Sequence, residues 1–329
     1  MSAETFLARL DRGPLNSFHR RLLLLTGLGW LFDALDVLLI GFLLVPIRDE
    51  LGLDVTRTAL VASAGFAGMA VGAAICGRLA DRYGRGRLIG ATLALFGVGS
   101  LLSAVAPSFE LLLGARMVAG LGLGGELPVI PTLLAEFAPR DSRGRFGLLL
   151  GLFWVAGALA AGLLAVTLLP VIGWRGVLAV GALPALYAAY LRRALPESPR
   201  HLAEQGRVAE ADAIVRRVER EGGGALITVA KPVAPARSGP LGIPTLFSGR
   251  YARRTALLWL LWSGVLFTSY GLFVLLPTLL ADRGLPAEEA MRWFFLSTLA
   301  QLPGVVAAAW LVERLGRKRT LGLFLIGAT

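Results

Sequence analysis

Four ionisable residues lie inside long apolar stretches of this sequence. They are Asp33 and Asp36 in the first stretch, and Arg116 and Glu126 in the fourth. A charge at the centre of a bilayer costs about 2.5–3.5 kcal/mol on insertion scales, so each of these residues needs a partner or a function. A carboxyl group beside an arginine can do one kind of chemistry: protonation neutralises the acid and releases the arginine. The alternative is a static buried ion pair.

The positions of these residues along their stretches favour a pair between Asp36 and Arg116. At a rise of about 1.5 Å per residue, Asp36 lies roughly 15 Å and Arg116 roughly 9 Å from the outer ends of their stretches, and an arginine side chain covers that difference. Asp33 is three residues from Asp36 and shares its helix face. Asp33 and Glu126 have three possible roles: lining a cavity, carrying a proton onward, or being held neutral by desolvation.

Membrane-spanning helices must position these charges. The chain of 329 residues is 56% hydrophobic, with a mean hydropathy of +0.69, far above what the core of a soluble domain requires. Apolar stretches long enough to span a bilayer occur at 22–47, 57–77, 88–106, 110–135, 146–170, 172–191, 255–281 and 293–312. A ninth stretch begins at Leu321 and is too short to cross, so we expect the sequence to be a fragment of a longer protein.

The positive charge is distributed unevenly between the loops. A net charge of +11 would suggest nucleic acid binding in a soluble protein. However, 27 of the 33 Lys and Arg residues fall in alternate segments, as the positive-inside rule requires. These segments are 1–21, 78–87, 140–145, 192–254 and 314–319. We therefore expect a multi-pass protein of the cell (inner) membrane, with a cytoplasmic N-terminus, in contact with lipid and not with nucleic acid.

A short motif of an acid, an arginine, a spacer and Gly-Arg occurs twice, at 81–85 and 313–317. Its repetition after long apolar stretches predicts a duplicated helical bundle, an architecture typical of transporters. We predict that these turns and nearby charges form a conformational latch, although they could merely orient helices or bind lipid headgroups. The predicted latch residues are Gly77, Asp81, Arg82, Gly84, Arg85, Glu136, Arg143, Glu197, Arg200, Glu313, Arg314, Gly316 and Arg317.

Three regions are expected along the chain. A six-helix bundle occupies 1–193, and 251–329 forms part of a second, C-terminal bundle. Between them, 194–250 combines an amphipathic helix over 201–221 with a flexible Gly- and Pro-rich linker. The Gly-rich run 120–125 superficially suggests a dinucleotide loop. Because it lies within an apolar span and no strand precedes it, it predicts close helix packing instead.

Several motifs resemble the major facilitator superfamily. They are Gly77 to Arg85, Glu136-Phe137-Ala138-Pro139, Arg143-Gly144-Arg145 and Pro196-Glu197-Ser198-Pro199-Arg200. The segments 32–36, 116–128 and 251–255 are similar to its proton-coupled metabolite branch, and to the niacin transporter family in particular. The sequence departs from the pattern at Gly86 and Ala309. The resemblance implies an all-α membrane protein with a six-helix N-terminal bundle and a truncated C-terminal bundle.

This resemblance also implies a function. We expect a secondary active transporter, without enzyme activity or cofactor, that takes up a small organic acid such as nicotinate with protons by alternating access. Protonation of Asp36 would release Arg116 for the substrate. The alternatives are an aromatic-acid or sugar-like proton symporter, or a membrane sensor or scaffold that carries nothing. We expect a monomer.

Aromatic residues of the fifth and seventh stretches could stack on a flat ring. Packing or interfacial anchoring is their commoner role, so we expect only one or two of them to touch substrate. They are Phe153, Trp154, Trp262, Phe267 and Tyr270. Gln301 is a polar candidate in the eighth stretch. The predicted substrate-binding residues are Arg116, Phe153, Trp154, Tyr270 and Gln301.

Overall fold

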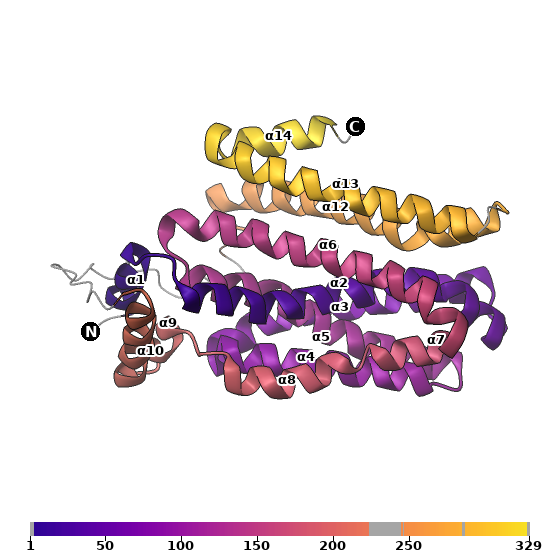
Figure 1. The fold of residues 1–329 in the computed structure, drawn as a ribbon, viewed down its shortest axis with the longest axis horizontal. Coiled ribbons are helices and arrows are strands. Elements are labelled where there is room, and N and C mark those ends of the chain that lie inside the picture. Colours follow the sequence, from indigo (N-terminus) through magenta and orange to yellow (C-terminus); the bar gives the residue numbers. More distant parts are fainter. Residues whose placement is uncertain (1–2, 224–244, 246, 285–286, 328–329) are drawn as a thin grey trace.

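The computed structural model describes residues 3–223, 245, 247–284 and 287–327, and it is almost entirely helical (Figure 1). The long helices run roughly parallel or antiparallel to one another. The helices are α1 Ala3–Arg12, α2 Ser17–Leu51, α3 Val55–Tyr83, α4 Arg85–Val105, α5 Phe109–Phe137, α6 Arg143–Thr167, α7 Leu169–Val180, α8 Leu183–Ala194, α9 Pro199–Glu204, α10 Val208–Glu221, α12 Gly249–Asp282, α13 Ala287–Leu315 and α14 Arg317–Gly327.

Among the described residues, seven helical segments are long and apolar enough to cross a membrane. They are α2, α3, α4, α5, the segment Arg140–Thr167, the segment Leu169–Ala194 and Arg292–Val312 within α13. The protein is therefore a multi-pass membrane protein, and the predicted all-α membrane fold is confirmed. The predicted span at 255–281 lies within α12, most of whose last turns have side chains outside the described part. The predicted linker also lies outside it, over 224–244.

Side chains just outside the helices explain several helix starts. Asn16 and Asp54 accept hydrogen bonds from backbone N–H groups in the first turns of α2 and α3, and Ser108 does the same for α5. These caps satisfy donors that lack an intrahelical partner. At the end of α2, Gly52 has φ of 61°, a left-handed conformation that favours glycine. Polar residues thus fix the turns at both ends of the bundle.

Glycines bring α3 and α5 into backbone contact. A side chain at Gly68 or Gly72 of α3 would overlap the α5 backbone near Met117 and Leu121. A side chain at Gly120 would in turn overlap the Gly65 carbonyl group of α3. The prediction that the Gly-rich run serves helix packing is therefore confirmed, because small residues allow backbones to approach closely.

Two predicted helices are interrupted. The stretch 172–191 lies within Leu169–Ala194, which is one candidate membrane span as expected, but it consists of two helices, α7 and α8, and Gly173, with φ of 65°, kinks α7 near its start. The amphipathic helix expected over 201–221 is wrong as a single element. It forms α9 and α10, separated by a turn in which Gly206 has φ of 78°. Only glycine adopts these conformations without strain, and it ends regular helices for that reason.

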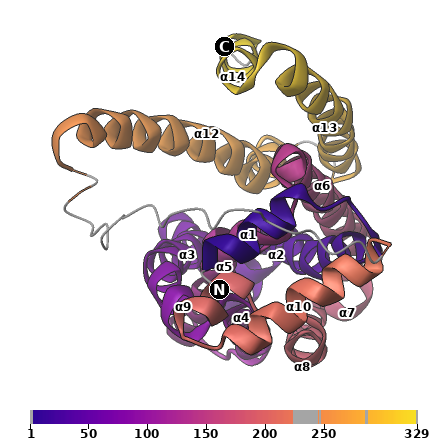
Figure 2. The ribbon, with the colours of Figure 1, turned by 90° about the vertical axis from the view of Figure 1, so that its left-hand side faces the viewer.

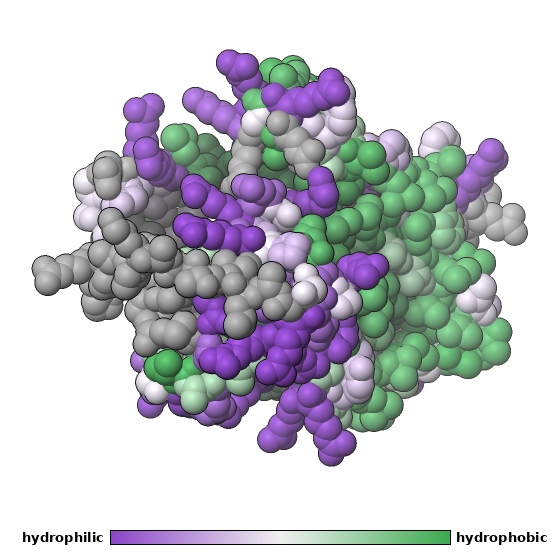
Figure 3. All heavy atoms as spheres, turned by 60° about the vertical axis from the view of Figure 1, so that its left-hand side comes forward, coloured by the Kyte–Doolittle hydropathy of each residue, from purple (hydrophilic) through white to green (hydrophobic). Residues whose placement is uncertain are grey.

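One end of the bundle, which we call the polar end, carries α1, α9 and α10. Hydrophilic residues gather there, and hydrophobic residues cover the flank beyond it (Figure 3). The helix α1 was not predicted from the sequence. Its Arg9 is buried and donates to Glu219 at 2.6 and 2.9 Å and to Asp212 at 2.6 Å. The Arg9 hydrogen bond lowers the pKa of Asp212, so this carboxylate stays ionised at neutral pH and the tether between α1 and α10 persists.

The last helices lie against α2 and α6. Where α12 crosses α2, Gly41 faces the Val274 backbone so closely that a side chain would not fit. Gly162 of α6 faces the ring of Phe294 on α13, which also packs on Phe42 of α2 at 4.8 Å between centroids. Figure 2 shows α12 leaving the main bundle at one end and α14 lying beyond α13.

We predict that Gly120→Leu lowers the thermal unfolding temperature by at least about 2 °C, because overpacking costs about 1–3 kcal/mol or more where backbone must move. Gly114→Leu is the matched control, since Gly114 is on the same helix and faces open space. Unfolding in detergent micelles, followed by intrinsic fluorescence, measures both. Equal melting of the two variants would contradict the proposed close packing of α3 and α5.

Candidate functional site

Asp36 of α2 and Arg116 of α5 form a buried, bidentate ion pair. Arg116 Nη1 donates to Asp36 Oδ1 at 3.1 Å, and Nη2 donates to Oδ2 at 2.6 Å. The Ser100 hydroxyl of α4 donates to the same carboxylate at 3.3 Å. Asp36 is 1% and Arg116 3% exposed. The structure thus brings together the two residues that the sequence paired, and adds a serine that sequence reasoning missed.

Aromatic rings line the neighbourhood of this pair. Trp154 of α6 lies 6.4 Å from Tyr270 of α12, and Tyr270 lies 4.8 Å from Phe66 of α3, between ring centroids. Phe66 also lines a cavity of about 10 Å³ beside Arg116. This is about the space that one water molecule needs.

The other predicted substrate-binding residues are placed differently. Phe153 packs onto Gly27 of α2, where its ring occupies the space that a side chain would need. Gln301 is half-buried on α13, and no described hydrogen bond connects it to Arg116. Trp262 is 59% and Phe267 82% exposed. Of the five aromatic candidates, Trp154 and Tyr270 belong to one ring cluster with Phe66, which lines a cavity with Arg116 and which sequence reasoning missed.

Asp33 and Glu126 differ from Asp36 in that neither has a hydrogen-bond partner. All four of their carboxyl oxygens are buried and unpartnered among the described residues. The exposed fractions are 2% for Asp33 and none for Glu126. Glu126 Oε2 lies 3.1 Å from the position that a Cβ atom on Gly29 would take. Gly29 is one helical turn before Asp33 on α2. The sequence therefore identified both acids, but not that they lie next to each other.

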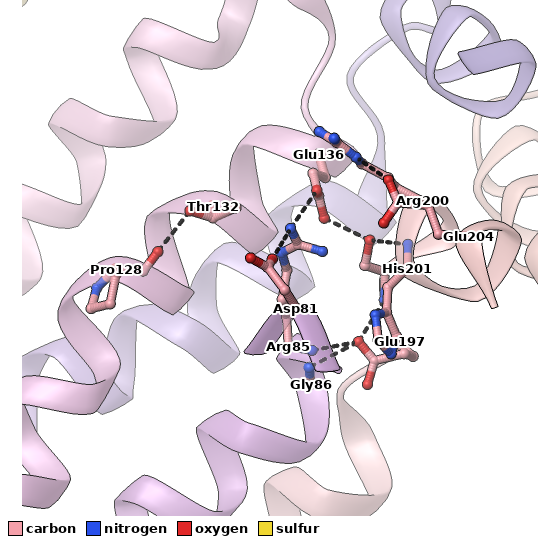
Figure 4. Close-up of polar contacts among 11 residues, drawn as sticks. Asp81, Arg85, Gly86, Pro128, Thr132, Glu136, Glu197, Arg200, His201 and Glu204 are labelled. Atoms are coloured by element: carbon pink, nitrogen blue, oxygen red, sulfur yellow. Dashed lines mark hydrogen bonds and ion pairs between the residues drawn. The ribbon is translucent and has the colours of Figure 1, made fainter. Parts of the chain in front are cut away.

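At the polar end, the carboxylate of Glu197 caps the N-terminus of α4. Its Oε1 accepts from the backbone N–H groups of Arg85 and Gly86 at 2.8 and 3.1 Å (Figure 4). Its Oε2 accepts from the backbone N–H group of Arg87 at 3.4 Å. A helix N-terminus attracts a negative charge in this way. Glycine is required at position 84 for two reasons: φ is 101°, and the Glu197 carboxylate leaves no room for a side chain.

A second polar contact links three elements. Buried Arg85 lies 3.3 Å from Glu136 of α5 and 3.2 Å from Asp81 of α3. Glu136 accepts a hydrogen bond from the hydroxyl of Ser198, which precedes α9, at 2.6 Å (Figure 4). The ends of α3, α4 and α5 are thereby connected to α9.

Parts of the predicted latch are not brought together. Glu197 and Arg200 were expected to act as a pair, but Arg200 pairs with Glu204 at 2.8 Å because Glu197 is engaged by α4. Gly77 faces open space within α3 and is not part of the turn, and Arg82 lies over the ring of the adjacent Tyr83.

The remaining latch residues lie on other elements. Arg143 bonds the carbonyl group of Ala135 at 2.8 Å and pairs with Asp11. In the second copy of the motif, Gly316 has φ of 77°, and Arg314 lies over Trp310 at 4.2 Å. The side chains of Glu313 and Arg317 lie outside the described part.

A pocket of about 420 Å³ opens beside these contacts at the polar end. Its size falls within the range of small-molecule sites. It is lined by Pro131, Thr132, Ala135, Glu136, Arg143 and Arg200. The pocket therefore extends along the last two turns of α5, from Glu136 toward the middle of the bundle.

Comparisons with known proteins agree with this architecture. Residues 34–329 match the family described as sugar (and other) transporter. The niacin transporter NiaP of Acinetobacter baylyi is 42% identical over 324 residues, covering 98% of this chain and 73% of that protein. The 4-hydroxybenzoate transporter PcaK of Pseudomonas aeruginosa is 34% identical over 325 residues, covering 96% and 71%.

A solved structure shows the same fold. The xylose transporter XylE from E. coli, in a partially occluded inward open conformation, matches with a TM-score of 0.66 and 18% identity. The match covers 92% of this chain and 75% of that one.

We predict that Glu197→Ala lowers the free energy of unfolding by about 1–2 kcal/mol, since it removes a cap from α4 and leaves its N–H groups without an acceptor. Glu204→Ala is the control, because its exposed pair with Arg200 contributes at most a few tenths of a kcal/mol. Thermal unfolding in detergent tests this expectation. If Glu204→Ala were the more destabilising of the two, the capping role of Glu197 would be wrong.

Proposed function

The chain belongs to the sugar (and other) transporter family of the major facilitator superfamily, and from this premise we propose that it carries a small aromatic carboxylate such as nicotinate together with a proton. The relatives are transporters, so the protein is a secondary transporter rather than an enzyme. The observation that carries the proposal is the buried ion pair between Asp36 and Arg116.

The ion pair supplies a mechanism for coupling. While Asp36 is ionised, it occupies both Nη atoms of Arg116. A proton that binds Asp36 removes the negative charge, and the guanidinium group then needs another anion, because an unpaired buried charge is costly. A substrate carboxylate meets this need with the same bidentate geometry. Proton binding and substrate binding therefore favour one another.

The aromatic cluster of Phe66, Trp154 and Tyr270 suits a ring attached to that carboxylate, since offset or edge-on ring contacts are favourable. The names of the two relatives support the same class, because niacin and 4-hydroxybenzoate each combine an aromatic ring with a carboxyl group. An aromatic acid other than nicotinate remains the second candidate, and the relative of Pseudomonas aeruginosa favours it.

The contacts at the polar end support a latch for alternating access. We propose that Arg85 holds α3 and α5 together in one conformation through Asp81 and Glu136 and releases them when the bundles rock against each other. The cap that Glu197 places on α4 would keep α9 attached to the bundle during this change.

We predict that Asp36→Asn abolishes proton-driven accumulation of nicotinate and retains substrate exchange. Asparagine mimics the protonated acid, so substrate still binds, whereas net proton movement requires a group that titrates. Uptake and counterflow assays in proteoliposomes measure the two activities. Asp54→Asn is the matched control, because asparagine also caps α3 and Asp54 lies at its start, away from the ion pair. Accumulation by Asp36→Asn against a gradient would disprove the proton site.

We predict that nicotinate competes for uptake at least about tenfold better than nicotinamide, because a hydrogen bond to a charged group contributes about 1.5–3 kcal/mol. Arg116→Lys should reduce this preference, since lysine cannot bind a carboxylate in a bidentate manner. Competition against labelled nicotinate, with benzoate as a third ligand, measures both effects. Equal competition by the amide would contradict recognition of the carboxylate by arginine.

A further inference from the structure

We propose that Glu126 and Asp33 form a second proton-carrying site, which receives the proton from Asp36 and delivers it to solvent through the pocket at the polar end. This inference rests on the proposed function, in which Asp36 is the first site. It assigns a direction and an exit to the proton.

The three acids lie one after another along the bundle axis. Gly29, Asp33 and Asp36 follow one another at intervals of four and three residues, so they form one stripe on α2. Glu126 lies against Gly29 at the polar side of this stripe. From Asp36, the carboxyl groups of Asp33 and then Glu126 therefore come progressively closer to the polar end, each about one turn from the last, near 5 Å of rise.

The two acids have no other described partner. Their four oxygens accept no hydrogen bond in the described part of the chain, although both side chains are buried. Two ionised carboxylates side by side in this setting would cost several kcal/mol, so the pair holds at least one proton. An ionisable residue inside a membrane span indicates a functional role, and a proton-carrying role fits two acids that have no hydrogen-bond partner among the described residues.

Other titratable groups face the pair from each neighbouring helix. Arg116 is occupied by Asp36, and the hydroxyl group of Tyr187 on α8 donates to the Leu25 carbonyl group at 2.8 Å. Tyr270 of α12 faces Asp33, and Cys76 of α3 lies beside Gly125. None of these groups supplies a positive charge that would hold Asp33 or Glu126 as a fixed carboxylate.

The helix beyond Glu126 provides an exit. Pro128 and Pro131 lack the N–H groups that would bond the carbonyl groups of Gly124 and Leu127, so these oxygens can accept from a protonated carboxyl group or from water. Pro131 also lines the pocket at the polar end. Five residues separate it from Glu126, a rise of about 7.5 Å.

The proposed steps conserve charge and atoms. At rest, Glu126 carries the proton of the pair and Asp33 is the carboxylate. The carboxylic acid of Asp36 gives its proton to Asp33, Glu126 loses its own proton to water in the pocket, and the proton on Asp33 then moves to Glu126. Asp36 regains its bond to Arg116, and the pair again holds one proton. One proton enters at Asp36 and one leaves at Glu126, with no change in oxidation state.

The test uses the full-length protein in proteoliposomes that contain a pH-sensitive dye. Glu126→Gln should reduce nicotinate-driven proton flux at least tenfold, while counterflow exchange stays within twofold of the wild type. The apparent Kd for nicotinate should still depend on pH, because Asp36 is intact, whereas in Asp36→Asn that dependence is lost. Asp33→Asn should behave like Glu126→Gln. Tyr187→Phe is the control and should retain the wild-type flux.

The outcomes separate this inference from the proposed function. If the wild type moves no protons with nicotinate, proton coupling itself is wrong. If the wild type moves protons and Glu126→Gln does so at the same rate, only the second site is wrong. Loss of both exchange and flux in Glu126→Gln and Asp33→Asn, without rescue of flux by Glu126→Asp, would assign these acids to helix packing and overturn the inference.

Discussion

The ion pair between Asp36 and Arg116 is the interaction on which the rest of the site depends. Each charge loses several kcal/mol of hydration on burial, and only close bidentate contact compensates for it. The helices α2 and α5 must therefore be held at a fixed separation. Gly68, Gly72 and Gly120 set the position of α5 by letting its backbone touch that of α3. The placement of the buried charge therefore depends on helix packing through small residues.

This dependence explains which parts of the site could be predicted from the sequence. Ionisable residues are rare in apolar stretches, so Asp36 and Arg116 were identifiable by type, and their depths predicted the contact. Phe66 was not identifiable, because aromatic residues are common in membrane helices and their spacing does not show which ring faces an arginine on another helix. Ser100 was also missed, because a small hydroxyl side chain in an apolar stretch does not indicate that its hydrogen bond joins α4 to α2.

At the polar end, the sequence predicted the participating charges better than their partners. Asp81, one of the predicted latch residues, pairs with Arg85. The cap on α4 comes from Glu197, which is separated from the start of this helix by 112 residues. A motif records which charges are present, whereas the pairing depends on how α9 returns to the bundle. At that end Gly206, with its left-handed conformation, separates α9 from α10 and interrupts a helix that hydrophobic periodicity alone made continuous.

In the proposed mechanism, the two kinds of buried acid explain why a proton and the substrate would travel together. Asp36 is stable as an anion because Arg116 compensates it, whereas Asp33 and Glu126 have no hydrogen-bond partner among the described residues and are stable only when the pair holds a proton. A proton on Asp36 without a substrate leaves Arg116 uncompensated, and a carboxylate substrate without that proton meets a site that is already neutral. Each half-loaded state therefore contains an unbalanced buried charge. The empty and the fully loaded states are both balanced, so they are the states in which the bundles can move at low cost, which is the condition for symport.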